Sequence, residues 1–342
     1  MSNPTLREEL VRITDAVVIS STSTFIFAGH SSNPIVSPMF GVQLNADMPV
    51  MIGELTGQLY RNCFSTRFEP DAVRVEMPST ISDTDWLETL SSANQSHERW
   101  EDGWQIVLNL PNGRMIAHRG DADRMLSPGE FLNVSAPGML PAPGMPVRVY
   151  LSRESRAMQP GFYFAFGETP FHAADELSIV RFYWNISAEG SPQLLEQASG
   201  ELNRWQVPFR IKVVSHRGMF QRLDSAVLYT PRRCASIAYE LCSEIRERLK
   251  PGLLFDTPLF TKRLAAGLAF AEDPGTQESF GMSRCRLLAE GIWLAHVQGA
   301  RSSGRLAIIE EHFHSQGISL DQPWLNPGSS GRFGSAALES TA

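Results

Sequence analysis

The stretch that most constrains this chain runs from residue 210 to residue 229, RIKVVSHRGMFQRLDSAVLY, and it predicts two strands around a short turn. Because side chains alternate along a strand, Ile211 and Val213 should face one way and Lys212 the other. A turn with an odd number of residues, or one bulge, would bring the charged residues of both strands to one side of the sheet. Those charged and polar residues are Arg210, Lys212, His216, Arg222 and Asp224.

Such a charged sheet face has two interpretations. It suits a doubly negative ligand such as a phosphate, with an amine at hand to take a proton. It is equally typical of the solvated face of a half-exposed antiparallel hairpin. The alternation of side chains is the same in both cases.

The composition is that of a soluble globular protein: 342 residues, of which 42% are hydrophobic and 20% charged. The net charge of −7 argues against a general nucleic-acid binder, so any anion site should be local. No apolar run approaches the ~20 residues that span a bilayer, and the amphipathic N-terminus is unlike a signal peptide. The four cysteines lack CxxC spacing, which predicts free thiols in a reducing cytoplasm. We therefore expect a cytoplasmic protein that contacts neither a membrane nor nucleic acid.

The order of the predicted elements indicates an α+β fold. Short strands, including a hairpin at Pro111-Asn112-Gly113, dominate the middle of the chain and precede a run of helices, whereas alternating β and α units are absent. The predicted helices span about 1–20, 52–63, 191–206, 232–250, 258–272, 279–298 and 301–316. We expect an antiparallel sheet packed against a cluster of C-terminal helices in an α+β domain, and a smaller N-terminal helical and β region. The expected boundaries are 1–80 for the N-terminal region, 81–325 for the α+β domain and 326–342 for a mobile tail.

Familiar catalytic and metal-binding signatures are missing from the sequence. There is no GxGxxG, GxxxxGK[ST], GxSxG or HExxH motif, and His312 and His314 are spaced two apart, which suits a metal poorly on a helix. We expect neither a metal nor a cofactor. Glu272 and Asp273 close a predicted helix, where acidic side chains oppose the helix dipole. Either they pair with a cation elsewhere, or they are solvated before the Pro274 turn.

Five ordered motifs resemble a known family. They are GFYFAFGE (161–168), RFYWNI (181–186), PFRIKV (208–213) after Leu202-Asn203, RLDSAVLY (222–229), and LFTKRLAAGLAFAEDP with ESFGMSRCRLLAEG. Together they resemble the HopA-type type III effector family over roughly residues 85–320. That family has members in plant pathogens, and other bacteria carry members in peptide natural-product gene clusters.

The resemblance implies an α+β fold and, for the biosynthetic members, a metal-independent phospho-Ser/phospho-Thr lyase. Such members resemble partners of an aminoglycoside-phosphotransferase-like kinase in class V lanthipeptide and thioamitide-type pathways. The kinase phosphorylates a precursor peptide, and the lyase eliminates phosphate to leave dehydroalanine or dehydrobutyrine.

The residues can be matched to what β-elimination requires, which is a base, cations for the departing phosphate and a proton donor. Lys212 is the best-placed base, because nearby arginines and partial burial favour a neutral amine. Arg222 and Arg181 are the expected phosphate clamps, since a planar fork suits phosphate oxygens. The remaining candidates are Arg210 beside the phosphate, Asp224 to orient Arg222 or Lys212, His216 or Tyr183 as proton donor, and Glu272, Asp273 and Arg284 in support.

The alternative hypothesis is a non-catalytic binding protein. The protein would then be an effector that binds a host partner, or a phosphopeptide-binding subunit. Residues 2–20 look helical rather than Ser-rich like a secretion signal, which favours the biosynthetic enzyme. A neighbouring kinase gene and a short precursor-peptide gene would support the lyase, whereas a secretion-chaperone gene would support the effector.

Overall fold

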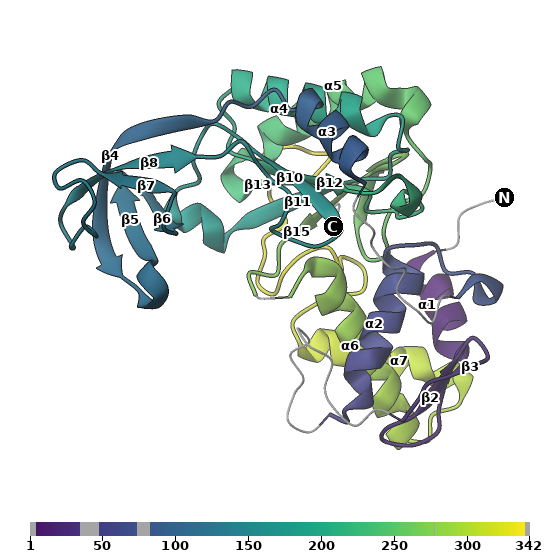
Figure 1. The fold of residues 1–342 in the computed structure, drawn as a ribbon. Coiled ribbons are helices and arrows are strands. Elements are labelled where there is room, and N and C mark those ends of the chain that lie inside the picture. Colours follow the sequence, from purple (N-terminus) through teal and green to yellow (C-terminus); the bar gives the residue numbers. More distant parts are fainter. Residues whose placement is uncertain (1–4, 35–47, 74–82, 277, 339–342) are drawn as a thin grey trace.

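A computed structural model describes residues 5–34, 48–73, 83–276 and 278–338. Its centre is a seven-stranded antiparallel sheet in the order β14-β15-β11-β13-β12-β10-β9 (Figure 1). The strands are β9 (Glu154–Ser155), β10 (Phe162–Phe166), β11 (Ile179–Trp184), β12 (Arg210–Val214), β13 (Ala226–Pro231), β14 (Lys262–Ala265) and β15 (Leu268–Glu272). The strand order places β12, the first strand of the charged hairpin, between β13 and β10.

One face of this sheet is covered by α3 (Thr84–Ala93), α4 (Ser191–Arg204) and α5 (Ala235–Leu249), which lie above it in Figure 1. The sheet side chains that pack there are apolar, such as Phe182 and Leu228. Burial of such residues is the main stabilising term for this layer.

The opposite face is only partly covered by helices. These are α1 (Leu6–Asp15), α2 (Met51–Leu59), the π-helix η1 (Tyr60–Phe64), α6 (Phe280–Val297) and α7 (Ser302–Ser315), accompanied by a small sheet of β1 (Val17–Ile19), β2 (Phe25–Phe27) and β3 (His30–Ser31). Their core includes Tyr183, Val227, Ala269 and Ala271, which belong to β11, β13 and β15. The side chains of β12 do not enter that core. The covering layer therefore ends beside the strand that carries Lys212.

The fold class agrees with the prediction: α+β, with antiparallel sheets and the C-terminal helices α6 and α7 packed against the central sheet. The N-terminal helices share one core with α6 and α7, because Leu10 and Leu55 are buried with Leu288 and Phe313.

A second antiparallel sheet of five strands, which we call the β-module (residues 99–151), projects from the main body in Figure 1. Its strands are β4 (Arg99–Asn109), β5 (Met115–Arg119), β6 (Ala122–Leu126), β7 (Phe131–Asn133) and β8 (Pro146–Leu151). It has its own core around Trp104 and Val149. The predicted turn is present as a 3₁₀ segment, Pro111–Gly113, between β4 and β5. Gly113 has a φ of 72°, which favours glycine.

Two expectations about the C-terminal half are wrong. The helix predicted over 258–272 is instead the β14–β15 hairpin, turned at Gly267 with a φ of 70°. Every residue of β15 is buried, because helices cover both faces of this part of the sheet, so the strand lacks the alternation that identifies a half-buried strand. The described part of the segment expected to be a mobile tail, residues 326–338, packs on the core: Phe333 lies 4.8 Å from Phe270, ring centre to ring centre, and Leu338 is fully buried. Residues 339–342 of that expectation lie outside the described residues.

No helix in the described part of the chain is both long enough and apolar enough to cross a membrane.

A buried ionic network joins α6 and α7. Arg286 lies between Glu278 and Glu290, at 3.0 and 2.9 Å, and the second oxygen of Glu290 is 2.8 Å from His312 Nε2. The Glu290 side chain has no exposed surface. Replacing it with alanine should therefore cost about 3 kcal/mol of unfolding free energy, because Arg286 and His312 lose a buried partner.

The matched control is Glu310→Ala on α7, where the carboxylate is 43% exposed and pairs with Arg7. It should cost less than about 1 kcal/mol. Denaturant unfolding of both variants makes the comparison, and equal losses would contradict a structural role for the buried network.

Candidate functional site

Lys212 is a buried amine to which no described residue supplies a counter-charge. It lies in mid-strand on β12, opposite Phe164 and Val227, and is only 5% exposed. Its ammonium group is 4.2 Å from the Phe162 ring centre and donates one long hydrogen bond, 3.3 Å, to the side-chain oxygen of Gln159. No carboxylate of a described residue lies within ion-pair distance of it. Burying an ammonium group in this way is costly unless an anion joins it.

Beside Lys212, an arginine is held rigidly by two partners. The Arg222 guanidinium donates to both oxygens of Asp224, each at 2.9 Å, and Asp224 is 2% exposed. The Tyr60 hydroxyl accepts from Arg222 at 3.1 Å and donates to Asp224 at 3.2 Å. Burial and the Asp224 charge raise the pKa of Tyr60, so its phenol keeps its proton. The Arg222 guanidinium lies 5.5 Å from the centre of the same Phe162 ring.

A second arginine lies on the other side of Lys212. Arg181 on β11 pairs with Asp273, and its guanidinium is 5.0 Å from the Tyr229 ring centre. The Lys212 amine is 6.0 Å from that ring centre, so the Tyr229 ring separates the two cations. The Tyr229 hydroxyl makes no hydrogen bond with any described residue.

Arg181, Lys212 and Arg222 thus form a row of three cations, separated by the rings of Tyr229 and Phe162. We call this the cationic row. Among the described residues, two carboxylates, Asp273 and Asp224, pair with the row. When Lys212 is protonated, one positive charge remains, and it favours an anionic ligand.

The hydroxyl of Tyr183 lies behind the row. Burial raises the pKa of Tyr183 although the Arg181 charge opposes this shift, and the hydroxyl makes no hydrogen bond of ordinary geometry. Tyr183 is packed among Phe64 and Phe280, with 2% of its surface exposed. It therefore lies deeper than a group that must meet a peptide.

The second half of the charged hairpin reaches the row by an irregular path. β13 begins only at Ala226, so Arg222 and Asp224 precede the strand and do not follow its alternation. They lie against η1, where the Leu223 N–H donates to the Ser65 carbonyl at 2.7 Å. A π-helical turn such as η1 is rare and often marks a functional position. In this protein it supplies Tyr60.

Two sequence candidates lie away from the row. His216 is beyond the end of β12, where its Nδ1 accepts from the Gly218 N–H, and the neighbouring Arg217 pairs with Asp83 at the N-cap of α3. That helix covers the opposite face of the sheet, so the structure does not bring His216 to the cationic row. Arg210 shares the face of Lys212, but it pairs with Glu176 and stacks on Phe171 at 4.4 Å.

The supporting candidates hold the C-terminal segment in place. Glu272 pairs with Arg232 and accepts from the Asn326 N–H at 2.6 Å. Arg284 donates to the carbonyls of Pro323 and Leu325, at 2.7 and 2.8 Å, and burial lowers its pKa to about 10. Of these residues, only Asp273 contacts the cationic row, through Arg181.

Sequence reasoning missed Tyr60, Tyr229, Phe162 and Gln159. Tyr229 was detectable, because it lies two residues after Val227 and so shares the face of Lys212. Tyr60 has no local signature, since it lies about 150 positions before the start of β12 and only docking of η1 brings it close.

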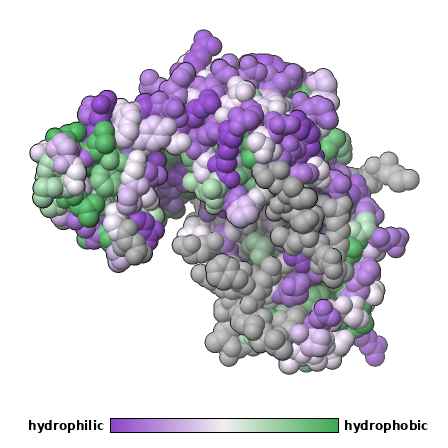
Figure 2. All heavy atoms as spheres, in the orientation of Figure 1, coloured by the Kyte–Doolittle hydropathy of each residue, from purple (hydrophilic) through white to green (hydrophobic). Residues whose placement is uncertain are grey.

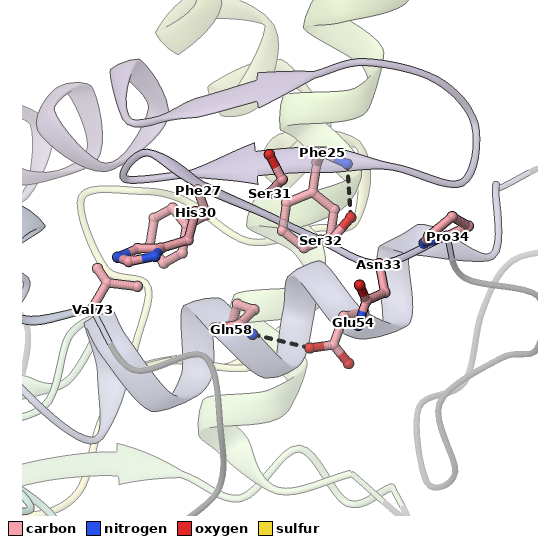
Figure 3. A pocket seen from close by; sticks show the side chains of 10 residues that line it. All are labelled: Phe25, Phe27, His30, Ser31, Ser32, Asn33, Pro34, Glu54, Gln58 and Val73. Carbon is pink, nitrogen blue, oxygen red and sulfur yellow. Dashed lines mark hydrogen bonds between the residues drawn. The ribbon is translucent and has the colours of Figure 1, made fainter.

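Two cavities lined by described residues lie elsewhere. The first, of about 350 Å³, lies between the β2–β3 hairpin and α2 (Figure 3), and neither a lysine nor an arginine lines it. Its carboxylate, Glu54, already accepts from Gln58 at 3.1 Å. The second, of about 330 Å³, contains Arg67 and Arg263, but Asp256 shares it with them. Chemistry rather than volume therefore selects the cationic row as the candidate site. Within the described ranges, no group of three His, Cys, Asp or Glu side chains is arranged to hold a metal ion.

Comparisons with known proteins identify relatives. Residues 153–325 match the HopA1 effector protein family, a span that contains the whole cationic row. Two similar solved structures are effector proteins from Pseudomonas syringae. The one from pv. tomato strain DC3000 is 17% identical, with a TM-score of 0.44, and the match covers 78% of this chain and 87% of that one. The one from pv. syringae strain 61 is also 17% identical, with a TM-score of 0.45, and covers 79% and 88%. No curated protein matches the chain significantly.

Proposed function

The chain belongs to the HopA1 effector protein family, and from its cationic row we propose that it is a phospho-Ser/phospho-Thr lyase. It would eliminate phosphate from a phosphorylated precursor peptide and leave dehydroalanine or dehydrobutyrine. The observation that carries the proposal is Lys212, a buried amine without a carboxylate partner, flanked by two arginines that are already held in place.

Each group of the row has a step in this elimination. The Lys212 amine takes the proton from Cα, and that electron pair becomes the Cα–Cβ double bond while the Cβ–O bond breaks. Arg222 and Arg181 bind the phosphate that departs. The Tyr229 hydroxyl donates its proton to the bridging oxygen. Lys212 then returns a proton to Tyr229, and both groups regain their starting state.

Tyr60 and Asp224 act through Arg222. Because Asp224 accepts from two guanidinium nitrogens and Tyr60 bonds to both partners, the fork is held before the phosphate arrives. Preorganised charge of this kind needs no rearrangement during the reaction. The partner that would make the phosphorylated substrate is a peptide kinase of the aminoglycoside-phosphotransferase type, as the family resemblance implies.

The direct test incubates a phosphoserine or phosphothreonine peptide with the protein in a buffer containing EDTA. Mass spectrometry should show loss of the elements of phosphoric acid, and an added thiol should trap the new double bond. EDTA should leave the rate unchanged, because no step uses a metal. A peptide that binds but stays phosphorylated would identify a phosphopeptide-binding protein instead, the alternative that the row also suits.

Replacing Arg222 with lysine should raise KM about tenfold, because the charge remains but the two-pronged contact with phosphate is lost. Steady-state kinetics on a phosphopeptide would measure this change in KM. Arg217→Lys is the control, since that side chain is 51% exposed and pairs with Asp83 outside the row. Equal KM values for the two variants would remove Arg222 from phosphate binding.

A further inference from the structure

Arg124 is an inward-facing charge that pairs with none of the described residues. It lies on β6 between Ala122 and Leu126, both buried in the core of the β-module, and it shares their face of the sheet. It is half-buried and makes no hydrogen bond or ion pair with any described residue. Burial lowers the pKa of its guanidinium, the Glu130 charge opposes the shift, and the charge of Arg210 adds to it. Two arginines from different sheets therefore lie within electrostatic reach of each other.

The nearby carboxylates are already engaged. Glu101 accepts from Arg99 at 2.8 Å and also pairs with Arg119. Glu130 accepts from the Ser127 N–H at 2.8 Å. Neither bonds to Arg124. Glu176 neutralises Arg210, so Arg124 is the charge that no described carboxylate neutralises.

Arg210 is tied to the same edge of the β-module. The segment that holds it, with Phe171 and Glu176, is anchored where the Ala173 N–H donates to the Asp121 carbonyl at 2.7 Å, just before β6. In Figure 2 the surface is hollowed where the β-module, on the left, meets the main body. Arg210 is 34% exposed, so its guanidinium remains within reach of a ligand.

We propose that Arg124 and Arg210 form a second anion site, which binds an acidic side chain of the phosphorylated peptide. The inference rests on the proposed function, because it takes Lys212 as the position of the modified residue. Arg210 and Lys212 are two residues apart on one strand face, roughly 7 Å. An extended peptide covers that distance in two residues. The site therefore selects Asp, Glu or a second phosphorylated residue two positions from the one that is modified.

An edge strand with an inward-facing charge also resists edge-to-edge aggregation. That role would explain Arg124 but not the second arginine beside it. Resistance to aggregation would not depend on the sequence of any peptide, whereas binding at a second anion site would. This difference separates the two explanations of Arg124.

The experiment measures binding and elimination with three phosphoserine peptides: Asp two residues before the phosphoserine, Asp two residues after it, and Gln at both positions. One Asp peptide should bind about tenfold more tightly to wild type than the Gln peptide, the effect of one charge-assisted hydrogen bond. Arg124→Gln should remove that difference and leave the Gln peptide and kcat unchanged. The control is Arg148→Gln, on the outer face of the same module at 3.5 Å from Asp102, which should change neither peptide.

The outcomes separate this inference from the lyase proposal. If wild type eliminates phosphate from all three peptides with equal KM values, or if Arg124→Gln weakens all of them equally, the second anion site is refuted and the lyase stands. If an Asp peptide binds preferentially through Arg124 but never loses its phosphate, the site stands and the lyase falls. Absence of any phosphopeptide binding overturns both. Thermal melts of each variant show whether Arg124 instead protects the edge strand from aggregation.

Discussion

Replacing Lys212 with methionine should lower the rate of phosphate elimination by at least about a hundredfold, because the base is lost. Methionine keeps an unbranched stem of similar length, so the fold should be retained. This choice matters because Lys212 is only 5% exposed. The position of Lys212 on a polar strand face at first suggests that truncation to alanine is harmless. Because the side chain is buried, truncation would instead leave a cavity in its place.

The measurement is single-turnover release of phosphate from a phosphorylated peptide, with thermal melts alongside. Lys212→Arg tests the base separately from the charge, because an arginine binds phosphate but does not give up its proton. It should bind the phosphopeptide and fail to eliminate. Lys250→Met, at an exposed side chain paired with Glu247, is the surface control. Near-normal elimination by a well-folded Lys212→Met protein would remove Lys212 from the mechanism and leave Lys262, on β14, as the next amine to test.

Replacing Tyr229 with phenylalanine should lower kcat by about a hundredfold with little change in KM. The substitution removes only the hydroxyl, and the ring that separates Arg181 from Lys212 remains. Phosphate binding should therefore persist while protonation of the bridging oxygen is lost. Pre-steady-state kinetics on the same peptide would distinguish the two effects.

Tyr239→Phe, on α5 at the opposite face of the sheet, is the matched control and should retain the wild-type rate. Tyr60→Phe provides the decisive comparison. Tyr60 holds Arg222, so Tyr60→Phe should mainly weaken phosphate binding and raise KM. If Tyr60→Phe lowers kcat while Tyr229→Phe keeps the wild-type kcat, Tyr229 is not the proton donor.

Local patterns in the sequence were sufficient for much of the architecture. The period of two in residues 210–214 places Lys212 on one strand face, and the structure has that strand as β12. Helical periodicity predicts α5, α6 and α7, which the structure places at Ala235–Leu249, Phe280–Val297 and Ser302–Ser315. The β14–β15 hairpin escaped prediction because burial on both faces removed the period that marks a strand.

The gathering of the cationic row depended on tertiary structure. Arg181 stands beside Lys212 because β13 pairs with both β11 and β12, and Tyr60 reaches Arg222 because η1 docks against the irregular turn before β13. His216, close to Lys212 in sequence, lies instead beside α3.

By itself, the sequence determined which side of its strand Lys212 occupies, because backbone geometry sets the alternation of neighbours over a few residues. Only the tertiary structure decided which charges surround that amine and which do not. Strand order and helix docking are set by burial of apolar surface over the whole chain, and no local sequence pattern at Tyr60 indicates this docking.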